Sequence, residues 1–282
     1  MFFAALLRSN SILRVLLRWL LWTNLLIAGS AAGWVIVTFR SFALPIDWLL
    51  VALAFFLALA FYTRDRLDEK ERQADLISMP DRTQWMTHHR VSLKRVVIFG
   101  FVAAIGLILL RPTAFWPLLA GLGFALSYTL RWLPWRGRRV GWKHLPAMKM
   151  PFVAGLWTLT AVITPAFVYD QLLLRQTWLL AGAVFLLIMV QILLNDLRDI
   201  KGDTRSGTLS LPVLVGDATA RWLGTGLMLL ALLLAWQIAS PALGGTSLYS
   251  LVLLWRYRRT HDAFWRPWIE VQGLIAAAIT LF

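Results

Sequence analysis

The sequence predicts an all-α fold that crosses a membrane several times, and three observations support this prediction. Of the 282 residues, 59% are hydrophobic, and the mean hydropathy is +0.68. A soluble protein of this length could not bury so large a share of apolar side chains. Apolar stretches of about 20 residues, the length that crosses a bilayer as a helix, recur along the chain. Positive charges also concentrate in alternate loops between these stretches.

Nine apolar stretches are the predicted membrane spans. We expect them to form two four-helix units and a ninth helix, within one integral-membrane domain covering residues 1–282. Residues 1–18 are apolar with interspersed arginines, which predicts an interfacial helix leading into an uncleaved first span. The last two spans are short, so their boundaries are approximate. The nine ranges are 16–39, 44–63, 96–110, 114–130, 152–169, 178–197, 222–238, 243–255 and 268–282.

The distribution of charge predicts which face of the protein is cytoplasmic. With nine spans, the N-terminal segment and the loops on its side carry 25 of the 28 Lys and Arg residues. These loops are 64–95, 131–149, 198–221 and 256–266. An excess of positive charge marks cytoplasmic loops, so we expect a multi-pass protein of a bacterial inner membrane with its N-terminus and acid-rich loops in the cytoplasm. The net charge of +14 then reflects topology and anionic lipid, and no nucleic-acid partner is expected.

The residue types exclude several kinds of chemistry. The chain has no cysteine and only four histidines. Disulfides, thiolate metal sites and cysteine nucleophiles are therefore excluded, and a metal centre built from imidazoles is not expected. A serine nucleophile with a histidine and an aspartate is not evident either. Carboxylates are the remaining candidates for chemistry.

Three aspartates lie at the end of the sixth predicted span and directly after it. Asp196, Asp199 and Asp203 occupy positions i, i+3 and i+7, which fall within about 60° of one another on a helix. Carboxylates this close repel one another unless a cation lies between them. Acids at the mouth of a membrane helix usually mark function, although a solvated helix end followed by a polar loop gives the same pattern.

A second acidic group follows the second predicted span. Asp65, Asp68, Glu69 and Arg72 fall within about 100° of one another on a helix. The second and sixth spans run in the same direction, which suggests two repeats related by an axis along the membrane normal. Facing carboxylates from two such repeats suit Mg²⁺, a hard ion that takes oxygen ligands and bridges them to phosphates.

Basic residues near these acids are candidates for binding phosphate charge. Each is also explained by the positive charge of cytoplasmic loops, and that explanation is the simpler one. Glu270 is expected to pair with Arg266, four residues earlier. The candidates in the loop after the fourth span are Arg131, Arg136, Lys143 and Lys149.

The stretch 195–216 resembles a known motif. It reads NDLRDIKGDTRSGTLSLPVLVG and is similar to the second aspartate-rich motif of the UbiA superfamily of intramembrane prenyltransferases. Aspartates that run into a Gly-x-x-x-Leu-Pro-Val-x-x-Gly turn are characteristic of its quinone and chlorophyll branches. Nine helices with acids at the ends of the second and sixth also fit that superfamily. Residues 79–82 resemble its Pro-x-Arg segment.

The first motif departs from the superfamily pattern Asn-Asp-x-x-Asp-x-x-x-Asp. Asp65 and Asp68 match it, but Arg64 occupies the Asn position and Arg72 the last Asp position. Either Glu69 or Glu71 could supply a replacement ligand, and Glu69 is the better placed of the two on the helix. The two cations lower the local negative charge, which weakens the expected binding of a second Mg²⁺.

The resemblance implies a Mg²⁺-dependent prenyltransferase within the bilayer, whose partners are a prenyl diphosphate and an aromatic or other lipophilic acceptor. The metal stabilises the leaving diphosphate, and aromatic walls shield the allylic carbon as it becomes cation-like. The catalytic residues implied are Asp65, Asp68, Asp196 and Asp199. The metal ligands implied are Asp65, Asp68, Glu69, Asp196, Asp199 and Asp203. The implied diphosphate-binding residues are Asn195, Arg72, Arg131 and Lys149.

Two other functions are compatible with the residues. The altered first motif fits a relative that binds an isoprenoid, a pigment or a partner without transferring a group. The acids could also couple ions in a transporter, although transporters place such acids near the bilayer midplane rather than at helix ends.

Overall fold

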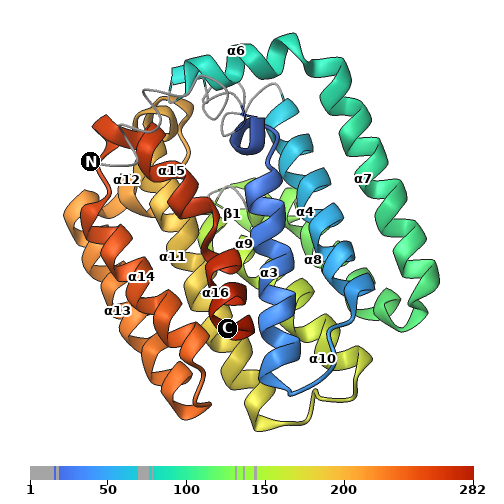
Figure 1. Cartoon of the computed structure of the whole chain (residues 1–282). Helices are drawn as coiled ribbons and strands as arrows, with labels where there is room; N and C mark the ends of the chain where they lie inside the picture. The colour runs from blue at the N-terminus through green and yellow to red at the C-terminus, as the bar shows by residue number, and fades with distance from the viewer. Residues whose placement is uncertain are drawn as a thin grey trace.

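The computed structural model describes residues 16, 19–68, 76–77, 79–130, 132–135, 137–142 and 145–282. Most helices run side by side in one bundle, and α6 lies across one end of it (Figure 1). The elements in chain order are α3 (Leu25–Ser41), α4 (Trp48–Leu67), α6 (Pro80–His88), α7 (Arg90–Leu110), η1 (Pro112–Ala114), α8 (Phe115–Thr129), β1 (Leu133–Trp135), β2 (Arg138–Val140), α9 (Lys149–Thr158), η3 (Leu159–Ile163), α10 (Thr164–Val168), α11 (Arg175–Ser206), α12 (Leu211–Val215), α13 (Asp217–Gln237), α14 (Pro241–Arg256), η4 (Arg259–His261), α15 (Asp262–Glu270) and α16 (Gln272–Leu281).

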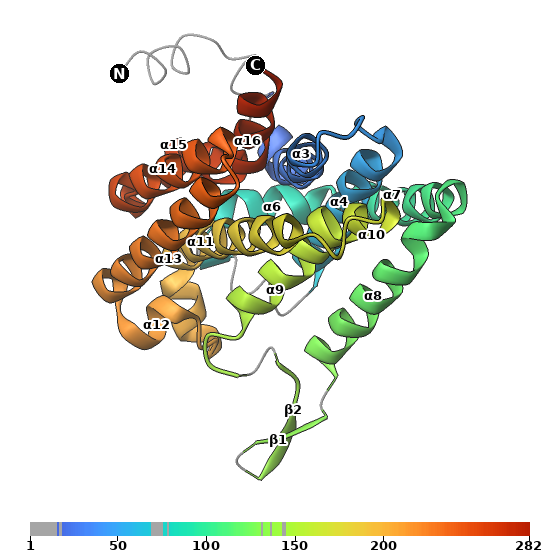
Figure 2. The ribbon, with the colours of Figure 1, turned by 90° about the horizontal axis from the view of Figure 1, so that it is seen from below.

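The all-α, membrane-spanning fold predicted from the sequence is confirmed. Five helices in the described residues are long and apolar enough to cross a bilayer. Each of the nine predicted spans overlaps a helix or a run of joined helices, but the count of nine membrane crossings stays a prediction. The described β-structure is one antiparallel hairpin, β1 with β2, which projects from the side of the bundle (Figure 2).

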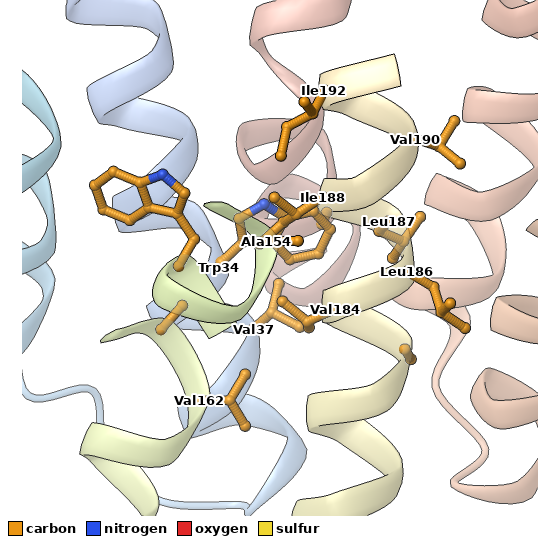
Figure 3. Packing of buried hydrophobic residues seen from close by; sticks show 14 of the residues in the cluster. Trp34, Val37, Ala154, Val162, Val184, Leu186, Leu187, Ile188, Val190 and Ile192 are labelled. Carbon is orange, nitrogen blue, oxygen red and sulfur yellow. The ribbon is translucent and has the colours of Figure 1, made fainter. Parts of the chain in front are cut away.

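Helix α11 forms the centre of the bundle. It packs against α9, α13 and α14, and its residues Leu180, Leu187 and Leu194 are fully buried. Their spacing of seven residues keeps them on one face of the helix. Figure 3 shows Ile188 and Ile192 of α11 in the packing between this helix, α3 and the α9 segment. Residues on α11 therefore face interior packing along most of its length.

Helix α7 contributes an outer face of the bundle. It packs mainly against α4, while Ile98, Phe99, Val102 and Ile105 are largely exposed. Exposed apolar surface on this scale is expected where a helix faces lipid chains. The position of α7 thus agrees with an integral membrane protein.

A close backbone contact joins α3 to α16. A Cβ atom added to Gly33 would lie 2.2 Å from the carbonyl oxygen of Gly273, and one added to Gly273 would lie 2.0 Å from the carbonyl oxygen of Ser30. The Gly273 N–H also donates to Ser30 Oγ at 2.8 Å. Glycine is required at both positions because backbone atoms of the two helices are in direct contact.

At the opposite end of the bundle from Asp196, three polar side chains join α4, α7 and α10. Arg111 Nε donates to Asp47 Oδ2 at 2.7 Å, and Arg111 Nη2 donates to the Tyr169 hydroxyl at 2.7 Å. The Tyr169 hydroxyl donates to the same Asp47 oxygen at 3.0 Å. Because each of the three residues lies at a helix end, the group fixes the ends of three helices together.

We expect Gly273→Ala to lower the free energy of unfolding by about 3 kcal/mol, because the methyl group overlaps backbone atoms that cannot move independently. Thermal unfolding of the purified protein in detergent, followed by circular dichroism, measures the change. Gly226→Ala on α13 is the control, since nothing lies within 4 Å of its added Cβ. Equal melting temperatures for the two variants would show that α3 and α16 leave room for a methyl group at position 273, which contradicts the direct backbone contact.

We expect Asp47→Ala to destabilise the protein by about 1–2 kcal/mol, because Arg111 and Tyr169 lose their shared acceptor. Arg111→Ala, the double variant and wild type complete a cycle, and its coupling energy should be about 1 kcal/mol. Arg40→Ala, an exposed cation at the end of α3, serves as the control. A coupling energy of zero in chemical unfolding would contradict the assigned contact.

Candidate active site

The acid-rich motif forms the C-terminal end of α11. Asp196, Asp199 and Asp203 are buried there, with exposed fractions of 1%, 9% and 7%. The helix is followed by Gly207, whose φ of 74° is in the left-handed region that glycine commonly adopts after a helix. A short turn leads to α12, which has Pro212 in its first turn. This local structure holds the three carboxylates at one end of the bundle.

Two of the carboxylates are neutralised by cations of the chain. Lys149 Nζ donates to Asp196 Oδ1 at 3.0 Å. Arg198 donates two hydrogen bonds to Asp199, at 2.9 and 2.8 Å. The sequence predicted Lys149 as a candidate phosphate ligand, and the structure places it directly beside the second motif. Arg198, within the motif itself, was not singled out from the sequence.

A backbone hydrogen bond positions the lysine. The Ala147 N–H donates to the Leu209 carbonyl at 2.8 Å, which joins the segment before α9 to the turn after α11. Asp196 Oδ2 is buried and has no hydrogen-bond partner in the described part of the chain. Carboxylate oxygens, one of them unpartnered, are ligands that a hard divalent cation prefers. The donor atoms at this end of α11 are therefore of the type that Mg²⁺ takes, but two of the three carboxylates are paired with cations of the chain.

The first acidic group lies at the end of α4. Asp65 is in the last turn and is exposed, and the Asp68 N–H donates to the Asp65 carbonyl at 3.1 Å as the helix ends. Among the described residues, no three acidic or histidine side chains lie close enough to hold one metal ion. The carboxylates of the second motif instead face Lys149 and Arg198, so a metal site shared by both motifs stays a prediction. Outside the described residues lie Glu69, Arg72, Arg131, Arg136 and Lys143.

Buried arginines lie near the acids at the same end of the bundle. Arg82 of α6 is 3% exposed, and its Nη2 donates to Asn24 Oδ1 at 2.5 Å. Arg266 of α15 is also buried; it donates to Glu270 at 3.0 Å and contacts Met79 Sδ at 3.3 Å. Burial and the neighbouring Arg266 lower the pKa of Arg82 well below its ordinary value. A buried excess of positive charge is stabilised by an anion.

The sequence pointed to Arg82 and Arg266 but did not show their surroundings. The predicted Arg266–Glu270 pair is confirmed. Arg82 belongs to the segment that resembles the superfamily's Pro-x-Arg pattern, but the sequence did not show that its side chain is buried. Asn24 was an isolated polar residue in the first span, and the structure shows that it joins Arg82 to Thr63, whose hydroxyl accepts from Asn24 Nδ2 at 3.1 Å.

A cavity extends into the bundle from the level of Asn195. It is narrow, with a volume of about 30 Å³, and it is partly open to the outside. The rings of Tyr62 and Trp157 stack at its wall with centroids 5.6 Å apart and planes 6° apart. Asn195, predicted as a diphosphate ligand, lines this cavity and donates to the Gln191 carbonyl at 3.2 Å. The full lining is Ile27, Ser30, Ala31, Trp34, Tyr62, Trp157, Ala161, Ile188, Gln191, Ile192 and Asn195.

The helices form a membrane bundle with buried carboxylates and cations at one end. Asn195, next to these acids, lines a cavity with aromatic walls. These features define an integral membrane protein with a polar site at the end of its helices. The model of the UbiA prenyltransferase family matches residues 79–268, more than half of the chain. The protein therefore belongs to the UbiA family of intramembrane prenyltransferases. The matched region begins after the altered first motif and includes the whole of the second.

A curated relative supports the same family. The bacteriochlorophyll synthase 34 kDa chain of Chloroflexus aurantiacus is 30% identical over 158 residues, which cover 54% of this chain and 47% of the relative. The chain thus spans about half the length of the curated relative that it matches. No solved structure matches significantly.

We expect Lys149→Met to destabilise the metal-free protein by about 3 kcal/mol, because Asp196 is left buried without its cation. Added Mg²⁺ should then raise the melting temperature of this variant more than that of wild type, since the carboxylate is free to bind it. Melting curves with EDTA and with Mg²⁺ test both effects.

Lys201→Met is the matched control, because Lys201 lies on the same helix end but is exposed. The interpretation fails if both variants melt alike in EDTA, or if Mg²⁺ stabilises wild type and Lys149→Met equally.

Proposed function

We propose that the protein transfers an isoprenyl group from a prenyl diphosphate to an aromatic or other lipophilic acceptor in a Mg²⁺-dependent reaction. The observation that carries the proposal is the burial of three carboxylates at the end of α11, the helix whose Asn195 lines a cavity with aromatic walls, in a chain of the UbiA family. Membership of the family supports prenyl transfer in general. The metal, the substrates and the residues named below are parts of the proposal.

The carboxylates would hold the metal. Asp196, Asp199 and Asp203 of α11 are the central ligands, and the α4 group of Asp65 and Asp68, with Glu69, would complete the set. When bound, Mg²⁺ supplies positive charge that stabilises the diphosphate leaving group. The unpartnered Asp196 oxygen supports this assignment.

Basic side chains would hold the rest of the diphosphate. Lys149 is already beside Asp196, and its Nζ retains donors for a second oxygen ligand. Arg82 and Arg266 bring buried guanidinium groups to the same end of the bundle. Arg72 and Arg131 are further candidates. Charge-assisted hydrogen bonds of this kind bind phosphate oxygens strongly.

The cavity would support the reacting carbon. As the bond from the allylic carbon to the diphosphate oxygen breaks, positive charge develops on that carbon. The stacked faces of Tyr62 and Trp157 are suited to stabilise a cation nearby. A carbon, oxygen or nitrogen atom of the acceptor then bonds to the allylic carbon and loses a proton. This scheme needs no covalent enzyme intermediate.

One observation favours a second candidate function. Arg64 and Arg72 replace family residues in the first motif, and the family match begins only at residue 79. A relative that binds an isoprenoid or a pigment without transferring a group would show the same departure. The name of the Chloroflexus relative supports a tetrapyrrole as one acceptor to include in assays.

Turnover tests the proposal. Purified protein in detergent would receive Mg²⁺, labelled geranylgeranyl or farnesyl diphosphate, and a panel of ring and tetrapyrrole acceptors. We expect prenylated product and diphosphate release. Asp196→Asn with Asp199→Asn should lower the rate by at least 100-fold, because charge stabilisation of the leaving group is lost (the scale of removing one electrostatic contact is about 10²–10³).

Asp170→Asn is the control, because Asp170 is exposed at the other end of the bundle and asparagine tolerates its φ of 55°. Binding of the diphosphate without turnover would support the second candidate, with Arg64→Asn and Arg72→Asp as the variants that should restore transfer. Absence of both binding and turnover for every chain length would disprove the proposed site.

A further inference from the structure

The segment between α8 and α9 combines positive charge with tryptophan and has no acid. Residues 131–149 contain six Lys or Arg, three Trp and no Asp or Glu. Lys149, the last of the six cations, pairs with Asp196. The topology of the chain accounts for the sign of this charge, but it does not account for the tryptophans. The other five cations are Arg131, Arg136, Arg138, Arg139 and Lys143.

Part of this segment forms the hairpin of β1 and β2. The two strands pair in antiparallel register, and Gly137 forms the turn with a φ of 77°. The base of the hairpin is held by Trp132 and Trp142, whose ring centroids lie 5.8 Å apart. Trp132 Nε1 also donates to the Ser127 carbonyl at 3.0 Å, which ties the start of the hairpin to the last turns of α8. The hairpin therefore has a fixed origin on the bundle.

Helix α8 indicates the level of the hairpin in the membrane. Exposed apolar side chains follow α8 from Trp116 to its end and continue through Leu130 and Trp132, which are 57% and 50% exposed directly before β1. A face of this kind lies against lipid chains. The hairpin starts where this apolar face ends, and it projects sideways from the bundle (Figure 2). It therefore extends along the membrane surface.

Backbone chemistry restricts the hairpin to the headgroup layer. A two-stranded hairpin leaves unpaired N–H and C=O groups along its outer edges, and such edges do not occur in the hydrocarbon region. Tryptophan is enriched at the level of the headgroups, where Arg and Lys also find phosphate oxygens. The end of α8 at which the hairpin starts is the end that carries Lys149 and Asp196, predicted to be cytoplasmic. Anionic lipid of that leaflet complements the charge of the segment.

We propose that the β1–β2 hairpin is a docking element for anionic phospholipid, in which the tryptophans hold the hairpin at the headgroup level and Arg138 and Arg139 bind lipid phosphate. Arg139 is exposed on β2. The proposal is independent of prenyl transfer, because it uses neither of the acidic motifs and none of the residues assigned to the diphosphate. Its consequence is that anionic lipid is enriched beside α8 and α9 relative to the surrounding bilayer.

A single fluorescent label tests this enrichment. Because the chain has no cysteine, Pro134→Cys gives one labelling site on β1, at an exposed position opposite Arg139 in the strand register. The labelled full-length protein would be reconstituted into phosphatidylcholine vesicles that contain a trace of quencher lipid with a nitroxide near the top of one acyl chain. The quencher is phosphatidylglycerol in one sample and phosphatidylcholine in the other. The ratio of the two quenching efficiencies measures the local preference for anionic lipid.

We expect phosphatidylglycerol to be preferred about 5- to 25-fold, the effect of one or two cations near an anionic headgroup. Arg138→Gln with Arg139→Gln should remove most of this preference, whereas Arg138→Lys with Arg139→Lys should keep it because the charge is retained. High salt should lower the preference of wild type. Lys94→Gln with Arg95→Gln is the matched control, because it removes the same charge from exposed positions near the start of α7.

The proposal is overturned if the two quencher lipids act equally on wild type, or if neither quenches the label, since the hairpin then lies outside the headgroup layer. It is also overturned if the glutamine pair keeps the preference. Equal losses in the glutamine pair and in the α7 control would assign the preference to the net charge of the protein and overturn it as well. If the glutamine pair cannot be reconstituted, a preference that is unchanged by high salt, or lost in the lysine pair, overturns the proposal.

Discussion

The structure depends on neutralising the carboxylates that are buried at the end of α11. Asp196 is almost fully buried, and its partner Lys149 is the first residue of α9, which packs against α11. A charge buried in this way is costly unless it is paired. The pairing therefore holds α9 against α11, and the space that remains between these helices is bounded by Trp157 and Asn195. The ion pair between Lys149 and Asp196 therefore joins the polar end of α11 to the helix that carries Trp157.

Charge at this end of the bundle comes from both carboxylates and guanidinium groups. The first motif has Arg64 and Arg72 where the superfamily has Asn and Asp. Buried Arg82 and Arg266 add positive charge from two further helices. Guanidinium groups stabilise phosphate oxygens without needing a second metal ion. The guanidinium groups of this region thus include two that depart from the superfamily pattern, Arg64 and Arg72, and one, Arg82, in a segment that resembles it.

The sequence predicted those features that depend on periodicity and composition. Hydrophobic runs located the helices, and the spacing of Asp196, Asp199 and Asp203 placed them on one helical face, because both depend only on helix geometry. Partners across the bundle could not be predicted in the same way. Lys149 meets Asp196 across 47 positions of the chain, and Trp34 meets the cavity through packing of α3 against helices more than 100 residues away. Such contacts depend on tertiary arrangement, which periodicity does not encode.

The contact between Gly33 and Gly273 also has a consequence for biosynthesis. The two glycines are separated by 240 positions in the chain. At about 5–20 residues per second, translation of that interval takes roughly 10–50 s. During this time α3 is in the membrane without the helix that its glycine face closely fits. Lipid or another protein must cover that face until α16 emerges, so the close contact between α3 and α16 forms late in synthesis.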